Sequence, residues 1–159
     1  MESPLQPGDS SRRIDSVAII ARAQALKRAA AAGQTPRLLA GKNLALMLAS
    51  ETPDADLFRK AATALGARVS TIRATPPESN SPDKTLKTAQ MLGRLYDAVE
   101  CQGVPRQVVD QIRTEAAMPV YDGVASGRHP SAQLDACLDA DAHGNHLFVI
   151  QAILVESML

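Results

Sequence analysis

The chain has 159 residues, 45% of them hydrophobic, and its 17 basic and 17 acidic residues cancel to a formal net charge of +0. This length suits one domain with a real hydrophobic core, and the balanced charge argues against nucleic acid or an anionic membrane as a partner. Cys101 and Cys137 lack metal-ligand spacing, which predicts two buried free thiols in a reducing cytoplasm and no metal site. Aromatic residues make up only 3% of the chain, which predicts no stacking site for bases.

The first 32 residues are expected to form a leader and one helix. Residues 1–13 are polar and contain Pro and Gly, which predicts a flexible leader and no signal peptide. Residues 14–32 are rich in alanine and predict an amphipathic helix that ends before Gly33. The apolar residues that recur there at helical spacing are Ile14, Val17, Ala21 and Ala25. No apolar run in the chain approaches the length of a membrane span.

Strand and helix patterns alternate from residue 43 onward. Residues 43–49 are nearly all apolar, which is typical of a strand buried on both faces of a parallel sheet. Thr52-Pro53-Asp54 predicts a helix start, because a hydroxyl can cap it, proline fits its first turn and an acid suits its positive end. Ser81-Pro82-Asp83 repeats this chemistry. The two helices are expected to end near residues 65 and 96, with further strands at 67–72, 97–101 and 118–121 and a helix at 105–116.

This alternation predicts the fold class. We expect an α/β domain of three layers, a mainly parallel four-stranded sheet with helices on both faces. Such sheets bind ligands at the carboxyl ends of their strands. The site is therefore expected in the loops that follow Ala49, Ile72, Cys101 and Tyr121.

Several short motifs resemble the ornithine and aspartate carbamoyltransferases. Residues 39–45, Leu-Ala-Gly-Lys-Asn-Leu-Ala, are similar to the entry of that family's first strand. The resemblance continues in the family's order through residues 65–66, 97–99, 118–120, 122–124 and 129–130. It implies a carbamoyl-phosphate-binding type of domain over residues 14–140.

The C-terminal residues look like the last helix of the same family. Residues 145–155 match its pattern, although in full-length relatives an entire amino-acid-binding domain precedes this helix. The resemblance implies that this second domain is missing and that residues 141–159 pack back on the first domain. The expected apolar face consists of Leu147, Ile150, Leu154 and Met158.

The phosphate cradle of the family is altered in this sequence. Relatives carry Ser-Thr-Arg-Thr-Arg after the first strand, where amides and guanidiniums hold the phosphate. The matching residues 52–56 read Thr-Pro-Asp-Ala-Asp, so Asp54 and Asp56 replace both arginines and Pro53 removes an amide donor. We interpret the two carboxylates as stabilising their own helix start rather than as a catalytic pair.

Two further positions bear on activity. Gln102 stands where relatives present an arginine to the carbamoyl group. His129 matches the family's histidine that polarises the carbamoyl carbonyl, but the glutamine of His-Pro-x-Gln is displaced to Gln133. His129 is thus either a vestigial catalytic donor or a residue that caps the following helix.

Other basic residues are candidates to replace the lost arginines. Arg73, Lys84, Arg106 and Arg128 fall near the expected ligand edge, and Arg128 is the first candidate because it adjoins His129. His143 and His146 are interpreted as surface residues without a metal. The predicted ligand-binding residues are Thr52, Asp54, Asp56, Gln102, Arg128 and His129.

These substitutions predict a catalytically inactive, carbamoyltransferase-like protein without a cofactor that acts as an oligomeric interaction module. Two alternatives stay open: a protein that binds a neutral or cationic small molecule, and a carbamoyltransferase subunit of amino-acid metabolism completed by a partner chain. The resemblance implies a homotrimer, and a full-length carbamoyltransferase is a candidate partner. Nucleic acid and membranes are not expected to bind.

Overall fold

The computed structural model describes residues 15–74, 81–138 and 144–159. Its four strands form one all-parallel sheet in the order β2-β1-β3-β4. They are β1 (Asn43–Leu48), β2 (Arg68–Arg73), β3 (Ala98–Gln102) and β4 (Val120–Asp122). The predicted parallel four-stranded sheet is confirmed.

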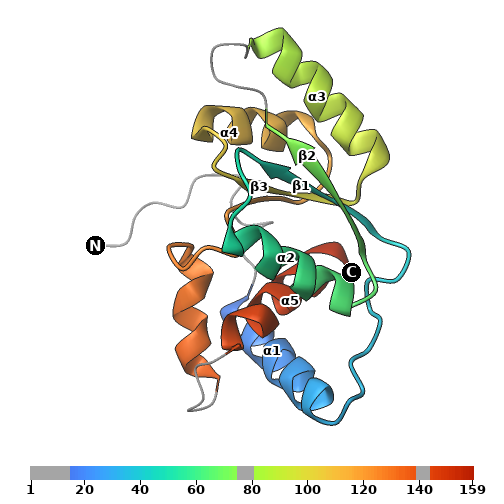
Figure 1. Ribbon diagram of the computed structural model, residues 1–159, viewed down its shortest axis with the longest axis vertical. Coiled ribbons are helices and arrows are strands. Elements are labelled where there is room, and N and C mark those ends of the chain that lie inside the picture. Colours follow the sequence, from blue (N-terminus) through green and yellow to red (C-terminus); the bar gives the residue numbers. More distant parts are fainter. Residues whose placement is uncertain (1–14, 75–80, 139–143) are drawn as a thin grey trace.

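Helices cover both faces of this sheet, as expected. On one face lie α1 (Ser16–Ala31), α2 (Pro53–Ala64) and α5 (Asn145–Met158), and on the other lie α3 (Pro82–Leu95) and α4 (Arg106–Glu115) (Figure 1). Strand β1 alternates between the two cores: Leu44 and Leu46 face the first, whereas Ala45 and Met47 face the second. After the exposed Asn43, every residue of β1 is apolar, as this burial on both sides requires.

The helix starts form as the sequence predicts. The side chain of Thr52 accepts a hydrogen bond from the backbone N–H of Ala55 at 3.4 Å, with Pro53 in the first turn of α2. Ser81 accepts one from the N–H of Lys84 at 3.3 Å at the start of α3. These contacts lie within four residues of each cap, so local sequence suffices to specify them.

The predicted buried face of α1 is wrong. Val17 is 73% exposed and Ala21 and Ala25 are exposed, while Ile19 and Leu26 are buried together with Ala23. Alanine lies on every side of this helix and therefore marks no face. The larger side chains of Ile19 and Leu26 decide which side packs, because they bury more apolar area.

Helix α5 lies against both α1 and α2, in the same layer (Figure 1). Ile150 and Leu154 are fully buried as expected, but Val149, Gln151 and Ile153 are equally enclosed. The buried surface is broader than the predicted stripe because neighbours surround this apolar helix on several sides.

Polar contacts fix the position of α5. Arg22 pairs with Glu156 at 3.0 Å, and the Lys27 Nζ donates to Asn145 Oδ1 at 2.5 Å. Both contacts join α1 to α5. Among the described residues, no helix combines the length and apolar character needed to cross a membrane.

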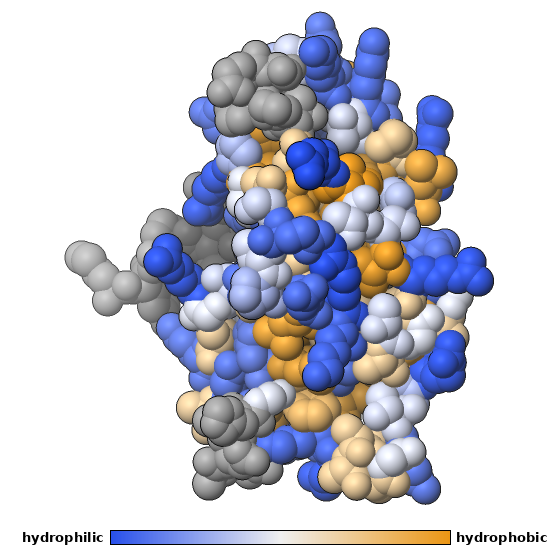
Figure 2. Space-filling view, viewed as in Figure 1, coloured by the Kyte–Doolittle hydropathy of each residue, from blue (hydrophilic) through white to orange (hydrophobic). Residues whose placement is uncertain are grey.

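Residues after β4 form a short 3-10 helix, η2 (Pro130–Cys137). This segment corrects one prediction, since Cys137 is exposed while Cys101 is buried, and both thiols are free. Hydrophilic side chains cover most of the face shown in Figure 2, with smaller apolar areas between them.

Candidate functional site

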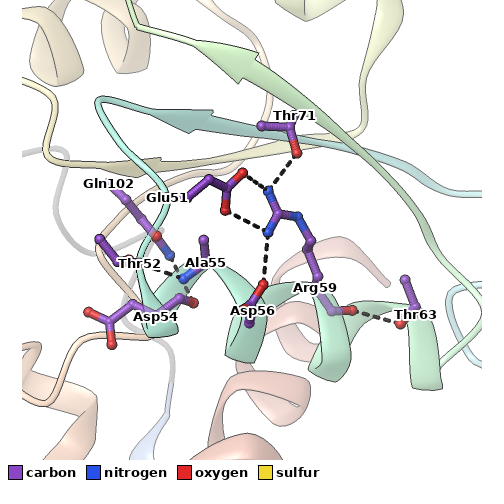
Figure 3. A network of polar contacts seen from close by, with 9 residues as sticks. All are labelled: Glu51, Thr52, Asp54, Ala55, Asp56, Arg59, Thr63, Thr71 and Gln102. Carbon is purple, nitrogen blue, oxygen red and sulfur yellow. Dashed lines mark hydrogen bonds and ion pairs between the residues drawn. The ribbon is translucent and has the colours of Figure 1, made fainter.

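The N-terminus of α2 meets the carboxyl ends of β1 and β3, where the sequence predicts a ligand. Thr52 caps the helix, and Gln102 at the end of β3 donates through Nε2 to the backbone carbonyl of Asp54 at 3.2 Å. Three of the predicted site residues, Thr52, Asp54 and Gln102, are therefore neighbours (Figure 3). The carboxylate of Asp54 points away from the ion-pair cluster formed by the next turn of the helix (Figure 3).

That cluster is centred on Arg59, which the sequence reasoning did not single out. Its Nη1 and Nη2 atoms bond to both carboxylate oxygens of Glu51, at 2.9 and 2.6 Å. Nη1 also contacts Asp56 Oδ1 at 3.1 Å, and Nη2 donates to the Thr71 hydroxyl on β2 at 2.8 Å (Figure 3). The i,i+3 spacing of Asp56 and Arg59 was the available signal for one of these contacts.

The cluster determines the charge at this edge of the sheet. The hydrogen bond from Arg59 lowers the pKa of Glu51, so its carboxylate is ionised at neutral pH. Three carboxylates, those of Glu51, Asp54 and Asp56, surround the start of α2, and the guanidinium of Arg59 is bound to two of them. Arg59 therefore neutralises local acids instead of facing an incoming anion.

Gln102 acts as a brace inside the domain. It is only 8% exposed, and its Nε2 contacts Glu100 Oε2 at 3.3 Å in addition to the Asp54 carbonyl. Its Oε1 atom is buried and has no hydrogen-bond partner among the described residues. An unpaired buried acceptor costs free energy, so this amide could gain from a ligand or water that donates a hydrogen bond.

Glu100 is the central buried charge of the site and was missed by the sequence reasoning. Its Oε1 accepts from the N–H groups of Gly123 and Val124 at 2.9 and 3.1 Å, and its Oε2 accepts from Ala125 at 3.3 Å. Burial raises the pKa of Glu100 to about 7, although these donors favour the ionised form and oppose the rise. A single acid within an apolar strand was the signal that could have identified it.

His129 caps η2. Its Nδ1 accepts from the backbone N–H of Ser131 at 3.1 Å and lies 2.7 Å from the Ser131 hydroxyl. Burial lowers the pKa of His129, which favours the neutral ring that such a cap requires. This geometry matches the capping alternative. Arg128 is exposed, and no hydrogen bond or ion pair in the described parts of the chain joins it or His129 to Thr52, Asp54 or Gln102.

His146 is not a surface residue, contrary to the prediction. Its side chain is 15% exposed, with Nδ1 2.9 Å from Asp135 Oδ1 and Nε2 3.0 Å from the carbonyl of Val124. The ring thereby links α5 to η2 and to the loop that follows β4. His143 lies outside the described residues. Within the described ranges, no group of acids, histidines and cysteines is arranged to hold a metal ion.

The other candidate cations lie elsewhere. Arg106 is exposed at the start of α4. Arg73 and Lys84 line a pocket on the α3 and α4 side of the sheet, away from the start of α2. Of the four candidate cations, Arg73 and Lys84 thus line the same pocket, but this pocket does not lie at the start of α2.

Comparisons with known proteins identify what the chain resembles. No known family profile matches it. The chain is 36% identical over 110 residues to the ornithine carbamoyltransferase of Actinobacillus pleuropneumoniae serotype 5b. These aligned residues are 69% of this chain and 33% of the relative. The enzyme of that name from Haemophilus influenzae strain PittGG is 33% identical over 119 residues, or 74% of this chain and 36% of the relative. The chain thus spans about a third of the length of these relatives.

Solved structures agree in fold. The ornithine carbamoyltransferase of Pyrococcus furiosus superposes with a TM-score of 0.65 at 22% identity, over 76% of this chain and 39% of that one. The catalytic subunit of M. jannaschii aspartate transcarbamoylase gives 0.62 at 20% identity, over 77% and 41%. The four-stranded parallel sheet and the sequence identity lead to one conclusion: this chain is homologous to one part of the ornithine and aspartate carbamoyltransferases and belongs to their family.

Proposed function

We propose that this domain is a catalytically inactive carbamoyltransferase homologue that acts as an oligomeric interaction module. The observation that carries the proposal is the chemistry at the start of α2. Asp54 and Asp56 occupy its first turn, and Arg59 is held by Glu51 and Asp56. Phosphate recognition at a helix start needs free amides and available cations.

Electrostatic repulsion disfavours a phosphate ligand at the start of α2. A carboxylate about 5 Å from a phosphate repels it by roughly 1 kcal/mol or more in a partly wet cleft. Pro53 lacks an N–H group and cannot contribute an amide donor to the first turn. The family's stabilising contacts are thus replaced by repulsive ones.

The remaining positions support the same reading. Gln102 is engaged with Asp54 and Glu100, and it carries no charge that could stabilise a carbamoyl oxygen in place of an arginine. His129 uses its Nδ1 as a helix cap, which leaves it a structural role. The predicted ligand set of Thr52, Asp54, Asp56, Gln102, Arg128 and His129 remains a proposal for any ligand of this domain.

Calorimetric titration tests the loss of phosphate binding. Purified protein is titrated with carbamoyl phosphate and with inorganic phosphate at low salt, beside a full-length ornithine carbamoyltransferase as the positive control. We expect no saturable heat from this protein. Saturable binding that disappears in R128A or H129A would overturn the proposal and favour a subunit whose site a partner chain completes.

The interaction role is supported by family resemblance. We propose a homotrimer built through this domain, in the cytoplasm, with a full-length carbamoyltransferase as a candidate partner. The expected leader, residues 1–13, lies outside the described residues. We also propose that residues 14–140 and 141–159 act as one domain plus its returning helix. A monodisperse monomer at micromolar concentration in size exclusion with light scattering would exclude the trimer.

A second candidate function is the binding of a neutral or cationic small molecule at the start of α2. Two observations favour it: the acidic character of the first turn and the unpaired Oε1 of Gln102. A ligand with N–H donors would complement both features. We expect guanidinium-bearing or amide metabolites, but not phosphates, to raise the melting temperature. If Q102L shows no such rise, the ligand binds at Gln102.

A further inference from the structure

A pocket of about 130 Å³ lies on the other face of the sheet from α2. It opens between α3, α4 and the carboxyl ends of β1 and β2, and its lining shares no residue with the start of α2 or with η2. Ligands of parallel sheets bind at this end of the strands. A hydrogen bond from Gln111 to the Pro82 carbonyl, 2.9 Å long, ties α4 to the start of α3 near this pocket.

The interior of the pocket is apolar. Met47 and Ile112 line it with exposed fractions of 5% and 0%, and Val104 closes it after β3. Ile72 and Val108 add partly buried apolar surface. A small hydrocarbon group would find water-free contacts here.

The polar lining residues carry positive charge or hydroxyl groups. Arg73 ends β2 and Lys84 lies in the first turns of α3, and both line the pocket. Arg73 is exposed, and its side chain makes no hydrogen bond or ion pair with any other residue that the structure describes. Thr85 and Thr88 add hydroxyls on the same side of α3. None of the described residues that line the pocket is Asp or Glu, so the guanidinium of Arg73 favours an anion there.

We propose that this pocket binds a small amphipathic carboxylic acid. Its hydrocarbon part packs against Met47, Val104 and Ile112, and its carboxylate lies at the rim beside Arg73. The size is appropriate, since a cavity of about 150 Å³ accommodates a benzene-sized molecule. Inorganic phosphate fits the charge but leaves the apolar interior unfilled. The site is separate from the start of α2 and does not depend on the proposed inactivity.

An NMR titration of the whole chain tests this site with 3-methylbutanoate as the probe. We expect saturable shifts of the amide signals of Ala74, Thr85 and Thr88. The alcohol 3-methylbutan-1-ol, which lacks the charge, and inorganic phosphate, which lacks the hydrocarbon, should both bind more weakly. R73Q should weaken 3-methylbutanoate about fivefold, as expected for an exposed ion pair.

The matched control is R68Q, which removes the same charge from the opposite end of β2. It should leave the affinity unchanged. T88F, which fills the pocket from α3, should abolish the shifts, and the dispersion of its spectrum checks that it remains folded. The inference is overturned if these amides do not respond up to the solubility limit of the acid, or if R68Q and R73Q weaken binding equally.

Discussion

Glu100 Oε1 lies 3.1 Å from the backbone nitrogen of Val124, so that a fully buried carboxylate on β3 holds the loop that follows β4. The backbone carbonyl oxygen of Val124 lies 3.0 Å from His146 Nε2, and His146 Nδ1 lies 2.9 Å from Asp135 Oδ1. The peptide groups of Val124 thereby connect the sheet to α5. Polar networks of this kind stabilise a fold only while every member keeps its partner.

The stability of the protein should depend on the titration of Glu100. Its pKa in the folded state is about 7, against 4.5 for an exposed glutamate, so the folded chain binds more protons between these values. The free energy of unfolding should therefore fall as pH rises from about 4.5 to about 7, by on the order of 3 kcal/mol from this group. Urea denaturation across this range, compared with E100Q, measures the difference.

Comparison with E100Q isolates this contribution because His129 titrates in the opposite sense. Burial lowers the pKa of His129, so the loss of its proton increases the free energy of unfolding as pH rises towards the ordinary histidine value of 6.5. Both proteins contain His129, and its contribution cancels in their difference. E115Q, a change of an exposed glutamate on α4, is the control and should parallel the parent. A constant difference between parent and E100Q would contradict the prediction.

The capping role of His129 predicts a specific order of stability. H129A removes the acceptor for the N–H of Ser131 and should cost about 1 kcal/mol of unfolding free energy. H129N supplies a side-chain oxygen at the cap and should retain most of the stability. Chemical denaturation at neutral pH measures both, and equal losses in the two variants would exclude the cap.

Restoring the family's cradle should restore anion binding. In P53T/D54R/D56R the first turn of α2 regains an amide donor and two guanidiniums, and two carboxylates are removed. We expect saturable heat with inorganic phosphate that weakens as salt is added, while the parent shows none.

A charge-matched variant controls for this change. D110R/E115R makes the same exchange of charge on the exposed side of α4. It should bind no more phosphate than the parent. Equal binding by both variants would attribute the effect to net charge and not to the geometry of the cradle.

The docking of α5 on the sheet can be measured with a double-mutant cycle. The Tyr121 hydroxyl on β4 forms a short hydrogen bond with the Ser157 hydroxyl on α5. Y121F and S157A should each cost about 1 kcal/mol, and the double variant should cost less than their sum. Y96F, which changes the other tyrosine, should be nearly neutral. Strict additivity in urea denaturation would show that the two hydroxyls are not coupled.

The sequence by itself determined the elements whose chemistry is local. The caps at Thr52 and Ser81 bond to amides three residues away, and the apolar residues 44–48 of β1 required burial on both faces. The alternation of strand and helix then restricted the fold to a parallel sheet between two layers of helices. These signals act over a few residues, so reading the chain in order was sufficient.

Only the tertiary structure decided which charges meet. Glu100 bonds to amides 23 to 25 positions along the chain, and Arg59 reaches Thr71, 12 positions away, after α2 has turned back to the sheet. Helix α1 buries Ile19 and Leu26 where it packs against α5, more than a hundred residues later in the sequence. Such partners are set by strand order and helix packing. No spacing in the sequence encodes them, because the chain brings them together only when the sheet has formed.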